Sequence, residues 1–221
     1  MLDKKINLFF KPILTKIANI LIKYKFSPNK ITLVGFILGI FCFIFLSLGM
    51  IYIALFLFLL NRFFDGIDGT LARLTTPSDL GGFYDIISDF FIYALLPFGF
   101  ILFDKNNFLS MSLLLTSFIG TCSTFLTTAW IFEKNKIQIN QLSKKSFYYS
   151  EGLIEGSETI FLFVLMFIFY EVASLIAWIF AVLCFLTAII RVIKVTKILF
   201  CNPHRLISRW GFFVSSLFSF I

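Results

Sequence analysis

A run of 30 residues without one charged side chain, residues 31–60, most constrains what this chain can fold into. About 20 apolar residues in a helix cross a bilayer, so the run is too long for one crossing and predicts two. We expect the chain to turn between Ser47 and Met50, which gives spans at about 31–48 and 51–72. The run therefore predicts a helical hairpin embedded in a membrane.

Hydrophobicity of this kind extends over most of the 221 residues, of which 59% are hydrophobic and 14% charged. That balance excludes an ordinary soluble domain. Further apolar runs predict spans near residues 82–103, 108–132, 154–170 and 173–194. We expect an all-α integral membrane protein with six transmembrane helices. It forms one domain, residues 1–221, with its core at 31–194 and a cytoplasmic or interfacial tail at 195–221.

The N-terminal residues differ from the spans. Over residues 2–25, apolar side chains recur at three- and four-residue steps, with lysines on the opposite arc. This pattern is typical of an amphipathic helix in the membrane interface, whose lysines meet anionic headgroups. Residues 1–30 are therefore predicted to be interfacial, either framing a site at the headgroup level or serving only as an anchor.

Lysine and arginine are distributed unevenly about the predicted spans. All but one of the 19 basic residues fall in the N-terminal segment, the second and fourth loops with their flanks, or the tail, and Lys105 is the exception. Basic residues near span ends are retained on the cytoplasmic side. We expect a multi-pass protein of the cell (inner) membrane with both termini in the cytoplasm.

Against this apolar background, residues 61–91 hold five of the 12 acidic residues, namely Asp65, Asp68, Asp79, Asp85 and Asp89. Charge at membrane depth is usually kept for pairing, ion binding or catalysis. Asp65 and Asp68 are three residues apart on one predicted helix, and Asp85 and Asp89 are four apart on the next. Two pairs of carboxylates would face each other if these helices are antiparallel neighbours. Asp79, in the turn, is interpreted as a solvated N-cap.

Four carboxylates this close favour cations between them. Ligands that are all oxygen suit Mg²⁺, Mn²⁺ or Ca²⁺, and two such ions would clamp a diphosphate. Gly69 and Gly81 leave room for a flat ligand or its phosphates, and Arg73 is placed to fork onto a phosphate. One of the aspartates, less tied to metal, could accept a proton from an attacking hydroxyl.

The stretch DGIDGTLARLTTPSDLGGFYDIISD resembles the signature of the CDP-alcohol phosphotransferases, D-x-x-D-G-x-x-A-R, usually eight residues, then G-x-x-x-D-x-x-x-D. All eight fixed positions are present: Asp65, Asp68, Gly69, Ala72, Arg73, Gly81, Asp85 and Asp89. The one departure is a linker of seven residues. The segment FSPNKIT, residues 26–32, is also similar to the segment before the first span in many members.

The resemblance implies a transferase of phospholipid biosynthesis. It would move a phosphatidyl or similar group from a CDP-linked lipid, CDP-diacylglycerol in the first place, to the hydroxyl of an alcohol, releasing CMP. It implies two divalent cations, Mg²⁺ or Mn²⁺, bound by Asp65, Asp68, Asp85 and Asp89, with Asp89 also acting as the catalytic base. The cytidine diphosphate would be bound by Gly69, Ala72, Arg73, Gly81, Ser78, Asn29 and Thr32. The expected partners are the donor, the acceptor, membrane lipids and a second copy in a homodimer, and not nucleic acid.

The residues leave the acceptor open between glycerol 3-phosphate, inositol phosphate, serine, choline and others. Two interpretations are open for Arg191, Lys194 and Lys197: they form a basic pocket for a phosphorylated acceptor, or they are ordinary positive residues that anchor the span on the cytoplasmic side. Two interpretations are also open for Glu151, Glu155 and Glu158: they face the site and favour a cationic or neutral acceptor, or they are acidic residues at the start of a helix with no role in the site. Two other classes are weighed. A divalent-cation transporter would need acidic or polar residues in the outer halves of several spans, and the sequence has only Asp104 and Glu171 near the outer loops. A catalytically inactive structural relative would be expected to have lost at least one motif residue, and none is missing.

Overall fold

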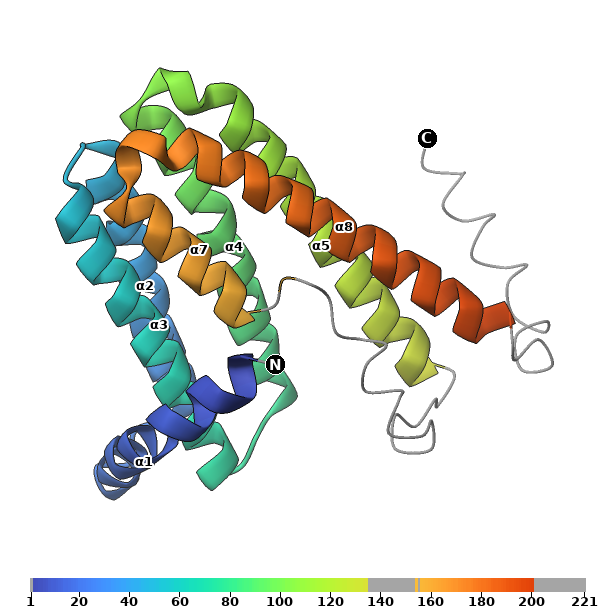
Figure 1. The fold of residues 1–221 in the computed structure, drawn as a ribbon. Helices are drawn as coiled ribbons and strands as arrows, with labels where there is room; N and C mark the ends of the chain where they lie inside the picture. Colours follow the sequence, from blue (N-terminus) through green and yellow to red (C-terminus); the bar gives the residue numbers. More distant parts are fainter. Residues whose placement is uncertain (1, 135–153, 155, 201–221) are drawn as a thin grey trace, which may run out of the picture. The chain divides into compact units, whose positions relative to one another are not determined.

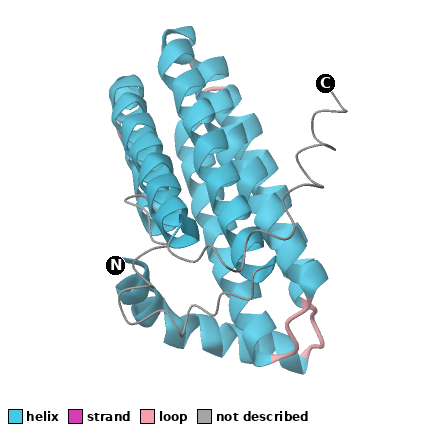
Figure 2. Cartoon of the chain, turned by 90° about the vertical axis from the view of Figure 1, so that its right-hand side faces the viewer, coloured by secondary structure: helices cyan, strands magenta, loops and turns pink. Residues whose placement is uncertain are grey.

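The structure is a computed structural model that describes residues 2–134, 154 and 156–200. Every regular element among these residues is helical and none is a strand (Figure 2). The helices are α1 (Leu2–Lys23), α2 (Pro28–Ser47), α3 (Ile51–Leu74), α4 (Asp79–Phe103), η1 (Lys105–Asn107), α5 (Phe108–Lys134), α7 (Gly156–Ile168), η2 (Tyr170–Val172) and α8 (Ala173–Phe200). The all-α prediction is confirmed.

Within the described residues, four segments are long and apolar enough to cross a bilayer: Pro28–Ser47, Asp79–Phe103, Lys105–Lys134 and Tyr170–Leu199. The chain is thus a membrane protein by helix length and composition. Two other predicted spans are helical but differ from these four. The C-terminal half of α3 carries several charged side chains. Helix α7 has 13 residues, about 20 Å at 1.5 Å per residue, which is shorter than a hydrocarbon core of about 30 Å.

The chain forms two compact units, Met1–Phe118 with Ile154–Val182, and Ile119–Leu153 with Leu183–Ile221. In the first unit, α2 packs against both α3 and α4, and α1 packs against α3 and α7 (Figure 1). Glycines on α2 let its neighbours approach closely. A Cβ at Gly39 would overlap the Ile92 side chain of α4, and a Cβ at Gly35 would touch Phe64 of α3.

Helix α1 is attached to the C-terminal half of α3 by an apolar cluster of five buried residues: Leu14, Ala18, Ile31, Ile67 and Leu71. Leu14 and Ala18 are the members of the cluster from α1, and their four-residue spacing places both on one face of that helix. The cluster holds α1 beside the helix that carries the first two motif aspartates.

The turns on either side of α3 set its length. The turn predicted between Ser47 and Met50 is confirmed, with Gly49 at a positive φ of 80° that favours glycine. After α3, residues 75–78 lead into α4, and the cap of α4 is Ser78, whose hydroxyl accepts a hydrogen bond from the Gly81 N–H at 3.1 Å. The prediction that Asp79 is the cap was wrong. Ser78 has the extended backbone that a cap requires, while Asp79 already lies in the first helical turn.

Candidate active site

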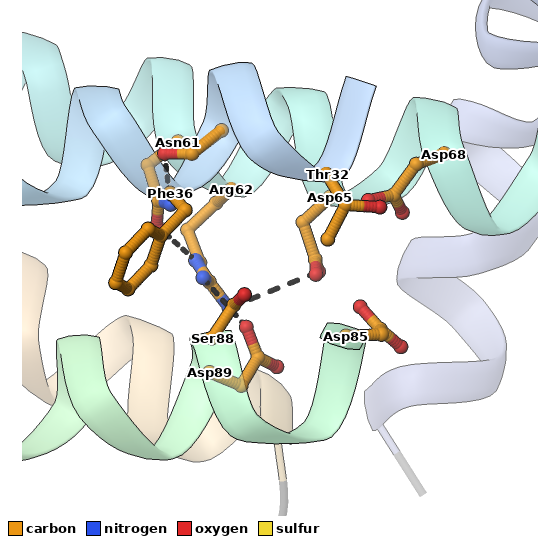
Figure 3. A pocket seen from close by; sticks show the side chains of 10 residues that line it. Thr32, Phe36, Asn61, Arg62, Asp65, Asp68, Asp85, Ser88 and Asp89 are labelled. Carbon is orange, nitrogen blue, oxygen red and sulfur yellow. Dashed lines mark hydrogen bonds and ion pairs between the residues drawn. The ribbon is translucent and has the colours of Figure 1, made fainter. Parts of the chain in front are cut away.

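The four motif aspartates meet in a pocket between α2, α3 and α4 (Figure 3). Helix α3 contributes Asp65 and Asp68, and α4 contributes Asp85 and Asp89 from the facing side. The pocket is lined by Thr32, Gly35, Phe36, Asn61, Arg62, Asp65, Asp68, Asp85, Ser88 and Asp89. The two pairs of carboxylates therefore face each other as the helical spacing predicts.

Three of these carboxylates form a compact group. Asp65, Asp68 and Asp85 each offer one oxygen, and these oxygens all lie within 4.8 Å of one another. Asp68 is only 4% exposed, and its Oδ2 is buried without a hydrogen-bond partner among the described residues. A buried carboxylate oxygen is stable only when it is paired or bound to a cation. These three oxygen ligands and the unpartnered Asp68 oxygen fit a divalent cation such as Mg²⁺ or Mn²⁺.

The fourth carboxylate, Asp89, has a different partner. The Nη2 of Arg62 donates to Asp89 Oδ1 at 2.8 Å, and its Nη1 lies 3.7 Å from Asp65 Oδ2. The same guanidinium donates from Nε to Asn61 Oδ1 at 2.8 Å and from Nη1 to the Tyr93 hydroxyl at 3.1 Å. Figure 3 shows the Arg62 side chain extending from α3 toward Asp89 on α4. The site thus consists of a group of three carboxylates and a fourth, Asp89, that is hydrogen-bonded to Arg62, whose guanidinium also forms a longer ion pair with Asp65.

Three residues predicted to bind the cytidine diphosphate lie together where α2 and α4 begin. A Cβ at Gly81 would lie 3.0 Å from Asn29 Oδ1 and 3.1 Å from Ser78 Oγ, closer than most side chains approach. Glycine therefore lets the start of α4 lie against the start of α2. Thr32, one turn further along α2, lines the pocket itself.

The other predicted residues of this set continue α3 beyond the pocket. Arg73 is exposed, and its Nη2 donates to Thr70 Oγ1 at 3.2 Å. A Cβ at Gly69 would lie 3.4 Å from Arg73 Nη1, an ordinary contact that leaves the guanidinium room to move. Ala72 is half-buried on the same turn. The pocket lining does not include Gly69, Ala72 or Arg73.

Asn61, Arg62 and Tyr93 belong to the site and are not predicted from the sequence. The charge distribution treats Arg62 as the flank of a cytoplasmic loop, whereas its side chain is 8% exposed inside the first unit. Asn61 Nδ2 donates to the Gly35 carbonyl at 2.8 Å, which joins α3 to α2. The available signal was helical spacing, because Arg62 precedes Asp65 by three residues and Tyr93 follows Asp89 by four.

The candidate acceptor residues are only partly described. Arg191, 8% exposed in the second unit, donates from Nη1 to the Thr121 carbonyl at 3.0 Å and the Thr124 hydroxyl at 3.2 Å. Glu158 accepts a hydrogen bond from the Ser157 hydroxyl at 3.1 Å in the first turn of α7. Glu151 and Glu155 lie outside the described residues. The identity of the acceptor therefore stays open.

Known proteins are similar to this chain in sequence and in fold. The sequence profile of the CDP-alcohol phosphatidyltransferase family matches residues 25–190. The inner membrane protein YnjF of Escherichia coli is 46% identical over 193 residues, which cover 87% of this chain and 94% of YnjF.

Among solved structures, Mycobacterium tuberculosis phosphatidylinositol phosphate synthase (PgsA1) with CDP-DAG bound has a TM-score of 0.61 at 18% identity, covering 83% of this chain and 94% of that one. The same synthase in complex with manganese and citrate has a TM-score of 0.60, also at 18% identity, covering 83% and 89%. At this identity the likeness shows a shared fold. Because the family profile spans most of the sequence and includes both helices of the aspartate motif, the chain belongs to the CDP-alcohol phosphatidyltransferase family.

Proposed function

We propose that this protein transfers a phosphatidyl group from CDP-diacylglycerol to the hydroxyl of an alcohol and releases CMP. The observation that carries the proposal is the group of Asp65, Asp68 and Asp85, together with the buried oxygen of Asp68 that has no hydrogen-bond partner among the described residues. The family supports the reaction class. The two related structures of phosphatidylinositol phosphate synthase, with CDP-DAG and with manganese, support the choice of donor and of a divalent ion.

Asp65, Asp68 and Asp85 would hold the divalent cations, with Asp89 completing the set for a pair of Mg²⁺ or Mn²⁺ ions. Bound there, these ions would neutralise the diphosphate and stabilise the charge that develops during phosphoryl transfer. The carboxylates come from two facing helices, so their separation is maintained by the packing of α2 against both. The site therefore needs no rearrangement of loops to bring its ligands together.

Asp89 is the base in this proposal. Its side chain is 30% exposed, so an acceptor hydroxyl can approach it from the pocket. Asp89 takes the hydroxyl proton while the acceptor oxygen bonds to the phosphorus that carries diacylglycerol. The bond from that phosphorus to the bridging oxygen of the diphosphate breaks, and CMP leaves with the bridging oxygen and its electron pair.

The cytidine diphosphate would bind near the N-terminal ends of α2 and α4 and the C-terminal end of α3. Asn29, Ser78 and Gly81 form one side of this region, and Gly69, Ala72 and Arg73 the other, with Thr32 inside the pocket. Arg73 is exposed and can turn from Thr70 to a phosphate, where a guanidinium makes paired hydrogen bonds.

In the membrane, we propose six spans in a single domain, residues 1–221, in which α3 and α7 cross the bilayer in addition to the four long apolar helices. Helix α1 lies in the interface, and the pocket, both termini and the interfacial helix are on the cytoplasmic side of the inner membrane. The diacylglycerol chains then stay in the bilayer while the headgroup reaches the carboxylates. A homodimer is part of this prediction.

The test is CMP release by the full chain, purified in detergent and returned to vesicles with CDP-diacylglycerol and Mn²⁺ or Mg²⁺. A panel of glycerol 3-phosphate, inositol phosphate, inositol, serine and choline identifies the acceptor by mass spectrometry of the lipid product. The variant Asp89→Asn should lose at least a hundredfold in kcat, because the amide cannot accept the proton. The matched control is Asp79→Asn, which removes an exposed carboxylate outside the pocket and should keep full activity.

Two outcomes would overturn the proposal. Absence of CMP release with every acceptor would refute the reaction, and full activity in Asp89→Asn would refute the role of the base. Transport of divalent cations into the same vesicles, without CMP release, would instead support a cation transporter.

A further inference from the structure

Arg62 places a buried positive charge beside the four aspartates, outside the family motif. We propose that Arg62 is a positioning residue, which holds Oδ1 of Asp89, leaves only the other Asp89 oxygen to a cation, and so limits how tightly the four aspartates bind metal. The inference rests on the proposed function for the role of Asp89. Its measurement, however, does not need turnover.

The guanidinium is held by protein contacts on three sides. Nε donates to Asn61, Nη1 to Tyr93 and Nη2 to Asp89. Asn61 is itself fixed by its hydrogen bond to the Gly35 carbonyl on α2. The orientation of Arg62 is therefore set by the backbone of α2 and transmitted to Asp89 on α4.

These contacts distinguish Arg62 from an arginine that binds substrate. Its side chain is 8% exposed, and its carbon Cζ lies 5.2 Å from the centre of the Tyr93 ring, whose face it covers. A phosphate would have to displace Asp89 to form a paired hydrogen bond with Arg62. Arg62 thus acts through Asp89 and does not contact the donor.

The charge of Arg62 has a predictable effect on the neighbouring carboxylates. Nη1 lies 3.7 Å from Asp65 Oδ2, so a cation bound by Asp65 is repelled by the guanidinium at short range. Removing this charge lowers the repulsion and also frees Asp89 Oδ1 to bind a cation. At the separations found here, the loss of one charge should raise the affinity for Mn²⁺ by roughly tenfold or more.

The two effects of losing Arg62 have opposite consequences. Binding of Mn²⁺ becomes tighter, but Asp89 is no longer held in place to accept a proton, so kcat falls. A purely structural arginine would not produce this combination, because loss of packing weakens metal binding and turnover together. Arg62→Lys should separate charge from geometry, since it keeps the charge but lacks the fork that reaches Asn61, Tyr93 and Asp89 at once.

The experiment titrates Mn²⁺ into the purified full chain without nucleotide and follows free Mn²⁺ by electron paramagnetic resonance. Arg62→Met should bind Mn²⁺ at least tenfold more tightly than the unmodified protein, and Arg62→Lys within about threefold of it. Both should have a lower kcat with CDP-diacylglycerol. The control Lys105→Met removes one exposed positive charge beyond the far end of α4 and should leave the titration unchanged.

Superimposable titrations of Arg62→Met and the unmodified protein would overturn the inference, as would weaker Mn²⁺ binding by the variant. If Arg62→Met does not fold, Arg62→Gln removes the same charge while its amide can still donate to Asp89. The same tightening is expected, and its absence overturns the inference equally. An unmodified protein that releases no CMP, together with tighter Mn²⁺ binding in the variant, would refute the function alone. Normal CMP release with unchanged Mn²⁺ binding would refute the role of Arg62 alone.

Discussion

The variant Asp68→Asn should be more stable than the unmodified protein when no divalent cation is present. When a divalent cation is added, the unmodified protein should become the more stable of the two. Asp68 is 4% exposed, and one of its oxygens has no hydrogen-bond partner among the described residues. The change keeps the shape of the side chain and removes one negative charge from the group. The new amide can also donate to a neighbouring carboxylate.

The magnitude follows from the distances between the carboxylates. The carboxylate oxygens lie within 4.8 Å of one another, and two unit charges at that largest separation repel each other by about 3 kcal/mol at an effective dielectric constant of 20. Asp68 has two such neighbours, but proton uptake by one of them limits the repulsion, so only one pair is counted. In chelator, Asp68→Asn should therefore be more stable by about 3 kcal/mol, or about 6–12 °C in thermal midpoint for a chain of this size.

Binding of Mn²⁺ should stabilise the unmodified protein more than it stabilises Asp68→Asn. A ligand at one hundred times its dissociation constant stabilises the folded state by about 2.7 kcal/mol. Asp68→Asn lacks one of the three oxygens and should show a much smaller shift. Thermal midpoints at one heating rate, in chelator and in Mn²⁺, check this for both proteins, with Asp79→Asn as the exposed control.

Two results would refute the reasoning. If Asp68→Asn is less stable than the unmodified protein in chelator, Asp68 is not under repulsion from its neighbours. If both proteins gain equally from Mn²⁺, the ion binds elsewhere.

Two further predictions concern the helices that position the site. Gly39→Ala should lower stability by about 1–3 kcal/mol because its Cβ would lie 2.7 Å from Ile92 Cγ1. Thermal midpoints should show that Gly39→Ala costs less stability in an Ile92→Ala background than in the unmodified protein, because the clashing side chain is then absent. Gly82→Ala should show no loss, since space is open there. An unchanged midpoint in Gly39→Ala would mean that α2 and α4 separate easily. Ser78→Ala should cost about 0.5–2 kcal/mol by removing the cap of α4, and Ser78→Thr should restore it; equal midpoints for both variants would contradict the capping role.

Helix positions and the four aspartates are predictable because each depends on local sequence. Absence of charge over residues 31–60, a run too long for one crossing, is sufficient to place the turn between α2 and α3. The spacing of Asp65 from Asp68 and of Asp85 from Asp89 places each pair on one helical face. The close group in the structure follows once those faces meet.

The exact ends of the helices are harder to predict from local sequence, because adjacent residues can suit the same terminal position. Ser78 and Asp79 are both good N-cap residues, and the backbone of the preceding turn decides between them. Helix α7 (Gly156–Ile168) is shorter than the predicted span of residues 154–170, because the backbone leaves helical geometry at Phe169, with a ψ of 52°, and a 3-10 turn follows.

The division of the four aspartates into three and one is a tertiary property. Spacing assigns Asp85 and Asp89 to the same face of α4 and so makes them equivalent. They differ because Asn61 and Gly35 fix Arg62 at the level of Asp89, one turn from Asp85. Two carboxylates of one motif thus acquire separate roles through contacts made by residues outside the motif.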